Sequence, residues 1–201
     1  MKGQFFILAA VVMAVSLLMI KDMFDAYLTI QTTEHQSLLY TREVLDDILG
    51  EYDYIVETAA CKNAIVDEAE AYLSDFTSKL AEENSITALF FFSAFNSSSG
   101  HLNFSMGNFL GDVVSVNITI TNGTTTVTKK SVIADRAVFN SDATISGVVN
   151  ITLSYEFCGE ERSDTLKLDL SATKLYLFID LKIEHQDKTI RRKHVYEKRL
   201  V

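Results

Sequence analysis

The first twenty residues constrain this chain more than any other stretch, because they contain a long apolar run. Between Phe5 and Ile20 the only polar side chain is Ser16, and Lys21 closes the run. Backbone groups find no water to bond inside a bilayer, so we expect a membrane-spanning helix here. Sixteen residues rise only about 24 Å, short of the roughly 30 Å hydrocarbon core. The helix is therefore expected to extend to Phe24, with Lys21 reaching the headgroups.

The residues around the run leave three interpretations open. A plain uncleaved anchor fits the sequence, whereas a cleaved secretory signal needs a small-x-small site, and residues 19–26 have no good one. In the third interpretation, Lys2-Gly3-Gln4 followed at once by Phe5 resembles the class III signal peptide of archaeal type IV pilin-like proteins. That resemblance implies that a prepilin peptidase-like enzyme cuts between Gly3 and Gln4 on the cytoplasmic side and that the apolar helix is retained.

Charge is unevenly distributed along the 201 residues, whose net charge is −9. Residues 31–84 carry thirteen acidic and three basic side chains, whereas residues 185–201 carry six basic and two acidic ones. We expect these two regions to meet, within one subunit or between neighbours. The overall acidity argues against a nucleic-acid partner. Lys2 before the run, against Asp22 and Asp25 after it, predicts a single-pass protein with a cytoplasmic N-terminus and the bulk of the chain outside the cell.

Helical periodicity dominates residues 25–84. Gly50 is expected to bend the first helix, at about 1 kcal/mol relative to alanine, and Asn84 to end the second. We predict an acidic helical stalk over residues 25–84, with its second helix packed on the first or on the next domain. Apolar residues recur every three or four positions in two stripes, which consist of Leu38, Leu39, Leu45, Ile48, Leu49, Tyr52, Ile55 and Val56, and of Ile65, Val66, Ala69, Tyr72, Leu73, Phe76 and Leu80.

From Ser85 onward the sequence is rich in β-branched residues, phenylalanine, serine, threonine and asparagine. Asn122-Gly123 is a typical two-residue hairpin turn. Seven or eight short strands predict a β-sandwich over residues 85–201. The expected fold class is therefore α+β, with a membrane helix (1–24), a stalk (25–84) and an all-β sandwich-like domain (85–201). Alternating or β-rich stretches predict strands over residues 87–95, 114–120, 124–128, 149–157, 166–170, 175–183 and 188–196.

Motifs for catalysis, cofactors or metals are missing from the sequence. The four histidines are scattered, and there is no His-Glu-x-x-His, Cys-x-x-Cys, phosphate loop or nucleophile elbow. The adjacent carboxylates Asp46-Asp47 and Glu82-Glu83 point about 100° apart on a helix, so they do not converge. We therefore predict a protein that is not an enzyme and has no cofactor or metal site.

The two cysteines suggest a link between the predicted stalk and sandwich. Cys61 falls between the two helical stripes, and Cys158 ends a predicted strand. In an oxidising exterior two such residues usually pair, and the long loop would contribute about 4 kcal/mol through the unfolded state. Two buried thiols that never meet are the alternative.

Five Asn-x-Ser/Thr sequons fall in the predicted sandwich. Alternation places two of them on polar strand faces and one in a turn, where a glycan could be attached, so we expect modification at this surface. The sequon asparagines are Asn96, Asn103, Asn117, Asn122 and Asn150.

The pilin resemblance implies a structural subunit of a type IV pilus-like or pseudopilus assembly at the cell surface. Copies of the chain, or of similar subunits, would pack through their apolar N-terminal helices. Ala10 and Ala14 support this packing, because small residues four apart let helices approach closely in lipid. The alternative is a single-pass, membrane-tethered β-sandwich that acts as a binding or adhesion module. An anchored or secreted enzyme ranks third.

Overall fold

The computed structural model describes Lys21 and residues 42–61, 65–82, 86–157, 160–185 and 188–200. The chain divides into two compact units, Met1–Asp46 and Asp47–Val201. The predicted membrane helix, including Gly3 and Gln4, falls outside the described residues apart from Lys21. Within the described ranges, no helix has both the length and the apolarity to cross a membrane.

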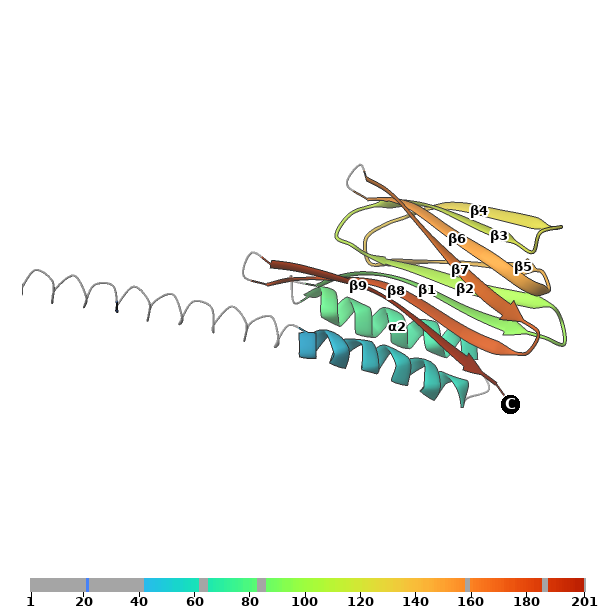
Figure 1. The fold of residues 1–201 in the computed structure, drawn as a ribbon, viewed down its shortest axis with the longest axis horizontal. Coiled ribbons are helices and arrows are strands. Elements are labelled where there is room, and N and C mark those ends of the chain that lie inside the picture. The colour runs from blue at the N-terminus through green and yellow to red at the C-terminus, as the bar shows by residue number, and fades with distance from the viewer. Residues whose placement is uncertain are drawn as a thin grey trace, which may run out of the picture. The chain divides into compact units, whose positions relative to one another are not determined.

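Two antiparallel sheets form a β-sandwich, which confirms this part of the predicted fold (Figure 1). The five-stranded sheet has the order β5-β2-β1-β8-β9, and the four-stranded sheet has the order β4-β3-β6-β7. Every pairing between neighbouring strands is antiparallel. The strands are β1 (Ile86–Asn96), β2 (His101–Phe109), β3 (Val114–Thr121), β4 (Thr126–Ile133), β5 (Ala137–Thr144), β6 (Gly147–Phe157), β7 (Glu160–Leu170), β8 (Lys174–His185) and β9 (Lys188–Arg199).

The main hydrophobic core lies between the two sheets. Strand β3 has the alternation expected of a half-buried strand, so Val116 and Ile118 point into this core while Ser115 points to solvent. Leu89 and Phe91 of β1 enter the same core from the five-stranded sheet. Removing these side chains from water supplies the main driving force for closing the sandwich.

The five-stranded sheet is buried on both faces. Phe90 and Phe92 of β1 point away from the inter-sheet core, yet they too are fully buried. The helical segment 47–60 and helix α2 (Ile65–Glu82) cover this second face (Figure 1). A strand covered on both faces reads as a continuous apolar run, which explains why β1 does not alternate.

Both helical segments belong to the same compact unit as the sheets. The boundary expected at residue 84 therefore differs from the observed one, because the helical stripes are buried on the body of the protein. Tyr52, Val56 and Leu73 of these stripes are fully buried, whereas Tyr72 is exposed. The helix runs from residue 42 to residue 60 without interruption at Gly50.

Candidate functional site

The predicted processing residues and cysteines have different outcomes. Gly3 and Gln4 lie outside the described residues, so cleavage between them stays a prediction. Cys61 is free and exposed, and the expected disulfide with Cys158 is not formed in the structure. Cys158 is not among the described residues, but the flanking strands β6 and β7 belong to the four-stranded sheet. The helical segment that precedes Cys61 covers the face of the five-stranded sheet that points away from the four-stranded sheet (Figure 1).

The five sequon asparagines differ in their access to solvent. Asn96, Asn103 and Asn150 are exposed. Asn117 is half-buried in β3, with β4 and β6 on either side, and its Oδ1 atom is buried. Asn122 is also half-buried. Three of the five therefore present their side chains to a modifying enzyme in the folded protein.

The Asn122 side chain closes the turn between β3 and β4. Its Oδ1 atom accepts hydrogen bonds from the backbone nitrogens of Thr124, at 3.1 Å, and Thr125, at 2.8 Å. Its amide nitrogen donates to the carbonyl oxygen of Ser146 at 3.2 Å. The nitrogen that would carry a glycan is thus engaged within the fold.

A docking contact ties the helical segment 47–60 to strand β9. The Asp53 Oδ1 atom lies 2.9 Å from Nε2 of His194, and Glu57 Oε1 accepts hydrogen bonds from the Tyr196 hydroxyl, at 2.7 Å, and from Lys198 Nζ, at 3.1 Å. The bonds from Tyr196 and Lys198 hold the pKa of Glu57 below its usual value. The acidic segment and the basic C-terminal strand therefore meet within one chain, as their charges predict.

The alternate side chains of β9 point the other way, into the sandwich. Arg191 forms an ion pair with Asp180 of β8, and Lys193 forms one with Asp164 of β7. Successive side chains of a strand point to opposite faces, so one basic strand bonds both to the helix and to the second sheet.

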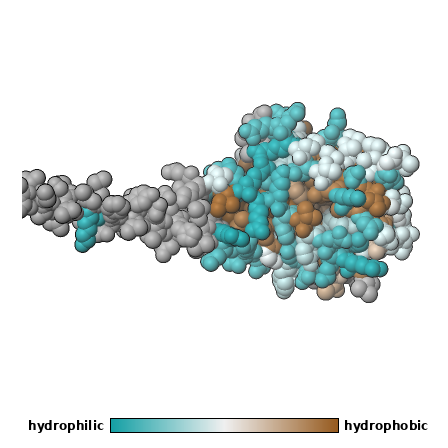
Figure 2. All heavy atoms as spheres, in the orientation of Figure 1, coloured by the Kyte–Doolittle hydropathy of each residue, from teal (hydrophilic) through white to brown (hydrophobic). Residues whose placement is uncertain are grey.

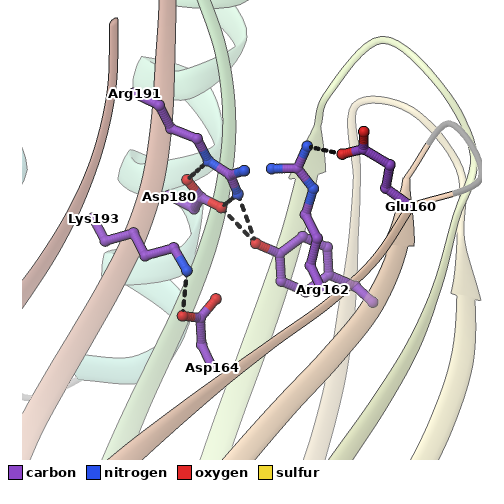
Figure 3. A network of polar contacts seen from close by, with 7 residues as sticks. Glu160, Arg162, Asp164, Asp180, Arg191 and Lys193 are labelled. Carbon is purple, nitrogen blue, oxygen red and sulfur yellow. Dashed lines mark hydrogen bonds and ion pairs between the residues drawn. The ribbon is translucent and has the colours of Figure 1, made fainter.

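A polar network closes one end of the inter-sheet core (Figure 3). The carboxylate of Asp180 is buried, with a residue exposure of 3%. It accepts a hydrogen bond from the Tyr155 hydroxyl at 2.5 Å and two from the Arg191 guanidinium, of which the one from Nε spans 2.6 Å. A buried charge needs this degree of pairing to be tolerated. Burial also raises the pKa of Tyr155 to about 12, so its hydroxyl remains a donor at neutral pH.

Three cationic side chains converge beside this network. Lys182 of β8 lies directly opposite Arg191 in the strand register, and Arg162 of β7 lies opposite Tyr155 of β6. The guanidinium groups of Arg162 and Arg191 point toward one another from the two sheets (Figure 3). Arg162 Nη2 also lies 2.9 Å from Oε2 of Glu160 at the rim.

A cavity of about 190 Å³ lies where these residues meet. Arg162, Lys182 and Arg191 line it, together with Asp180 and Tyr155. Thr87, Thr189 and Leu110 complete the lining. We refer to this space as the cationic cavity. Cations and hydroxyl donors around a small space can bind an anionic oxygen.

The outer face of the four-stranded sheet is a second concave surface. A hollow of about 710 Å³ there includes Ser115, Asn117 and Lys130 in its lining. Beside it, a row of four threonines crosses all four strands in register, formed by Thr128, Thr119, Thr152 and Thr165. Figure 2 shows hydrophilic and weakly polar residues over much of the described surface in its view, with hydrophobic residues in separate patches.

Sequence reasoning did not single out the cationic cavity. The sequence gives little indication of this cavity, because its residues lie on separate strands and only strand order and register bring them together. Asp180 alone stands out, as an acid within the buried apolar strand β8. Within the described ranges, no group of three histidine, cysteine, aspartate or glutamate side chains is arranged to hold a metal ion.

Comparison with known proteins gives no match for this chain among protein-family models, curated proteins or solved structures.

Proposed function

We propose that this chain is a structural subunit of a type IV pilus-like or pseudopilus assembly at the cell surface. The observation that carries the proposal is the docking of the helical segment 47–60 on β9 through Asp53 and Glu57. This segment follows the apolar run of residues 5–20 along the chain. A filament subunit needs its assembly helix joined firmly to its folded body, because force on one subunit passes to the next through that joint.

The N-terminal sequence supports the same function. Lys2-Gly3-Gln4 before the apolar run resembles an archaeal class III signal, so the proposal includes cleavage after Gly3 by a prepilin peptidase-like enzyme. The retained helix would hold the subunit in the membrane as a single span before assembly. Ala10 and Ala14 would then let neighbouring helices pack closely.

Two measurements on the full-length chain test the proposal. When the chain is co-expressed with a prepilin peptidase, intact-mass spectrometry should find Gln4 as the first residue. Replacing Ala10 and Ala14 by leucine should leave membrane insertion intact and reduce filament or complex formation, observed by electron microscopy and by native size. The matched control replaces Val11 and Val15 by leucine, at the same spacing, and should assemble normally. A mature chain that starts beyond residue 20, or equal assembly of both variants, would contradict the proposal.

A membrane-tethered binding or adhesion module is the second candidate. The hollow on the outer face of the four-stranded sheet favours it, because a concave surface lined by several serines, Asn117 and Lys130 can accept a polar ligand. The two candidates differ in oligomeric state. A chain that stays monomeric in the membrane at native expression, with or without the Ala10 and Ala14 replacements, would favour the tethered module.

A further inference from the structure

We propose that the cationic cavity binds a small oxyanion of the phosphate or carboxylate class between Arg162, Lys182 and Arg191. This binding goes beyond a structural role in a filament and does not depend on it. The cavity lies at one end of the inter-sheet core and takes its cations from both sheets.

The first step of the argument is the placement of like charges. Lys182 and Arg191 stand directly opposite one another on β8 and β9, an arrangement that destabilises a strand pair. The guanidinium of Arg162 points toward that of Arg191 from the other sheet (Figure 3). An anion bound among these groups would turn mutual repulsion into attraction.

The acidic groups nearby leave room for such an anion. Asp180 offsets one of the three cations and is already bonded to Arg191 and Tyr155. Asp164 also interacts with Tyr155, and it is paired with Lys193. The other two cations pair with Glu160 and Glu184, whose side chains are 72% and 58% exposed. Solvent screens the charge of these exposed acids, so a ligand oxygen can compete with Glu160 and Glu184 for the two cations.

The size and donors of the cavity indicate the ligand class. Its volume of about 190 Å³ is below the roughly 300–1,000 Å³ of sites for drug-sized ligands. The guanidinium groups can bond two oxygens of one phosphate or carboxylate at once, and Lys182 supplies a point charge. Thr87 and Thr189 also line the cavity, and a threonine hydroxyl can donate to an anion. The expected ligand is therefore small, anionic and rich in oxygen.

The test measures binding of inorganic phosphate and of acetate to the full-length chain in detergent micelles, by isothermal titration calorimetry at constant ionic strength in chloride. Lys182→Gln removes one cation from the cavity and should weaken binding at least about tenfold, since hydrogen bonds to charged groups are among the strongest. The matched control is Lys79→Gln on α2, which removes the same charge on the other side of the five-stranded sheet and should bind like the wild type. The relative affinity for phosphate and acetate identifies the ligand class.

A thermal unfolding scan separates binding from folding. In chloride without phosphate, Lys182→Gln should unfold at the wild-type temperature or higher, because it removes a like charge opposite Arg191. Phosphate should raise the unfolding temperature of the wild type and of Lys79→Gln, and do so less for Lys182→Gln. If neither anion bound, or if both variants lost affinity equally, the site assignment would be wrong. A lower unfolding temperature of Lys182→Gln with unchanged affinity would likewise overturn it, since Lys182 would then only stabilise the strands.

Discussion

Gly107 of β2 lies directly opposite Phe90 of β1, and the Phe90 ring occupies the space that a side chain at position 107 would need. A Cβ atom on Gly107 would lie 2.3 Å from Cε1 of Phe90, far inside the usual separation of carbon atoms. The ring is fully buried and stacks on Phe109 at a centroid distance of 6.0 Å, so it has little room to move. Gly107→Ala should therefore destabilise the protein by about 1–3 kcal/mol, measured by urea denaturation.

Gly50→Ala is the matched control for that substitution. Gly50 lies within the helix that spans residues 42–60, and no neighbouring atom lies within 4 Å of a Cβ placed there. Alanine at this position should raise the free energy of unfolding by about 0.5–1 kcal/mol, because glycine is a poor helix former. Equal effects of the two substitutions would rule out the steric explanation.

The buried pair Tyr52–Thr77 joins the two helical segments. The Tyr52 hydroxyl lies 2.8 Å from Thr77 Oγ1, which in turn donates to the carbonyl oxygen of Leu73 at 2.5 Å. Thr77→Val should destabilise by about 1–3 kcal/mol, because it leaves the tyrosine hydroxyl buried without its partner. Tyr52→Phe removes that hydroxyl and should cost less, about 0.5–1.5 kcal/mol. Chemical denaturation of both single variants and the double variant tests this order, and a double variant no better than Thr77→Val would contradict it.

Stability should fall above pH 10 because buried tyrosines resist ionisation. Burial raises the pKa of Tyr176 to about 12, and its hydroxyl donates to the carbonyl of Asp169 at 2.7 Å. An unfolded tyrosine ionises near pH 10, so between about pH 10 and 12 the unfolded chain releases a proton that the folded chain keeps. Ionisation of Tyr176 therefore lowers the free energy of unfolding by about 1.4 kcal/mol per pH unit between about pH 10 and 12, and does not lower it below pH 10.

Urea denaturation between pH 9 and 12 measures this contribution. Tyr176→Phe should reduce the slope of the unfolding free energy against pH by roughly 1.4 kcal/mol per pH unit, which corresponds to one proton. Tyr54→Phe is the control, because Tyr54 is 64% exposed and should leave the decline unchanged. An identical pH profile for wild type and Tyr176→Phe would contradict the assignment.

The docking of the helical segment depends on Glu57. Glu57→Gln weakens the bond to Lys198 by removing the charge, so the amides of residues 53–60 should exchange faster with deuterated solvent. Glu51→Gln is the matched control, since Glu51 is an exposed glutamate of the same helix. Hydrogen-exchange mass spectrometry compares the two variants. Unchanged protection in Glu57→Gln would show that apolar packing alone holds this helix.

Glycan occupancy, if the chain is modified after folding, should follow side-chain access. Asn96 and Asn150 are exposed and should be occupied in preference to Asn122, whose amide nitrogen donates to Ser146. Glycopeptide mass spectrometry on protein from a glycosylating host measures the order. Higher occupancy at Asn122 than at the exposed positions would indicate modification before folding.

Strands with one face in the core are the part of the fold that sequence predicts well. Strands β3 and β6 alternate because each has one buried and one solvated face. Strand β2 was not expected, because both its faces are covered while it carries Ser105, Gly107 and Asn108, so it neither alternates nor forms an apolar run. Strand β5 is an edge strand whose residues are mostly exposed or half-exposed, and it gives little hydrophobic signal.

The candidate site could not be predicted in the same way. Arg162, Asp180 and Arg191 belong to three strands of two sheets, and their meeting depends on strand order and register. The charge excess of the C-terminal strand did predict its contact with the acidic helix, as the pair of Glu57 and Lys198 confirms. Alternate basic side chains of β9 contact the helix and the four-stranded sheet. The overall charge of the strand does not predict this division.

The bond between Asp53 and His194 spans 141 positions and joins the first docked helix to the last strand of the chain. During synthesis the helix is made long before β9. The side of the helix that carries Asp53 and Glu57 therefore has no strand to bond until the residues of β9 emerge. Contacts between such distant positions also form late in folding, because they close a long loop of chain. A chain truncated before Lys188 would therefore leave Asp53 and Glu57 without the strand that fixes them.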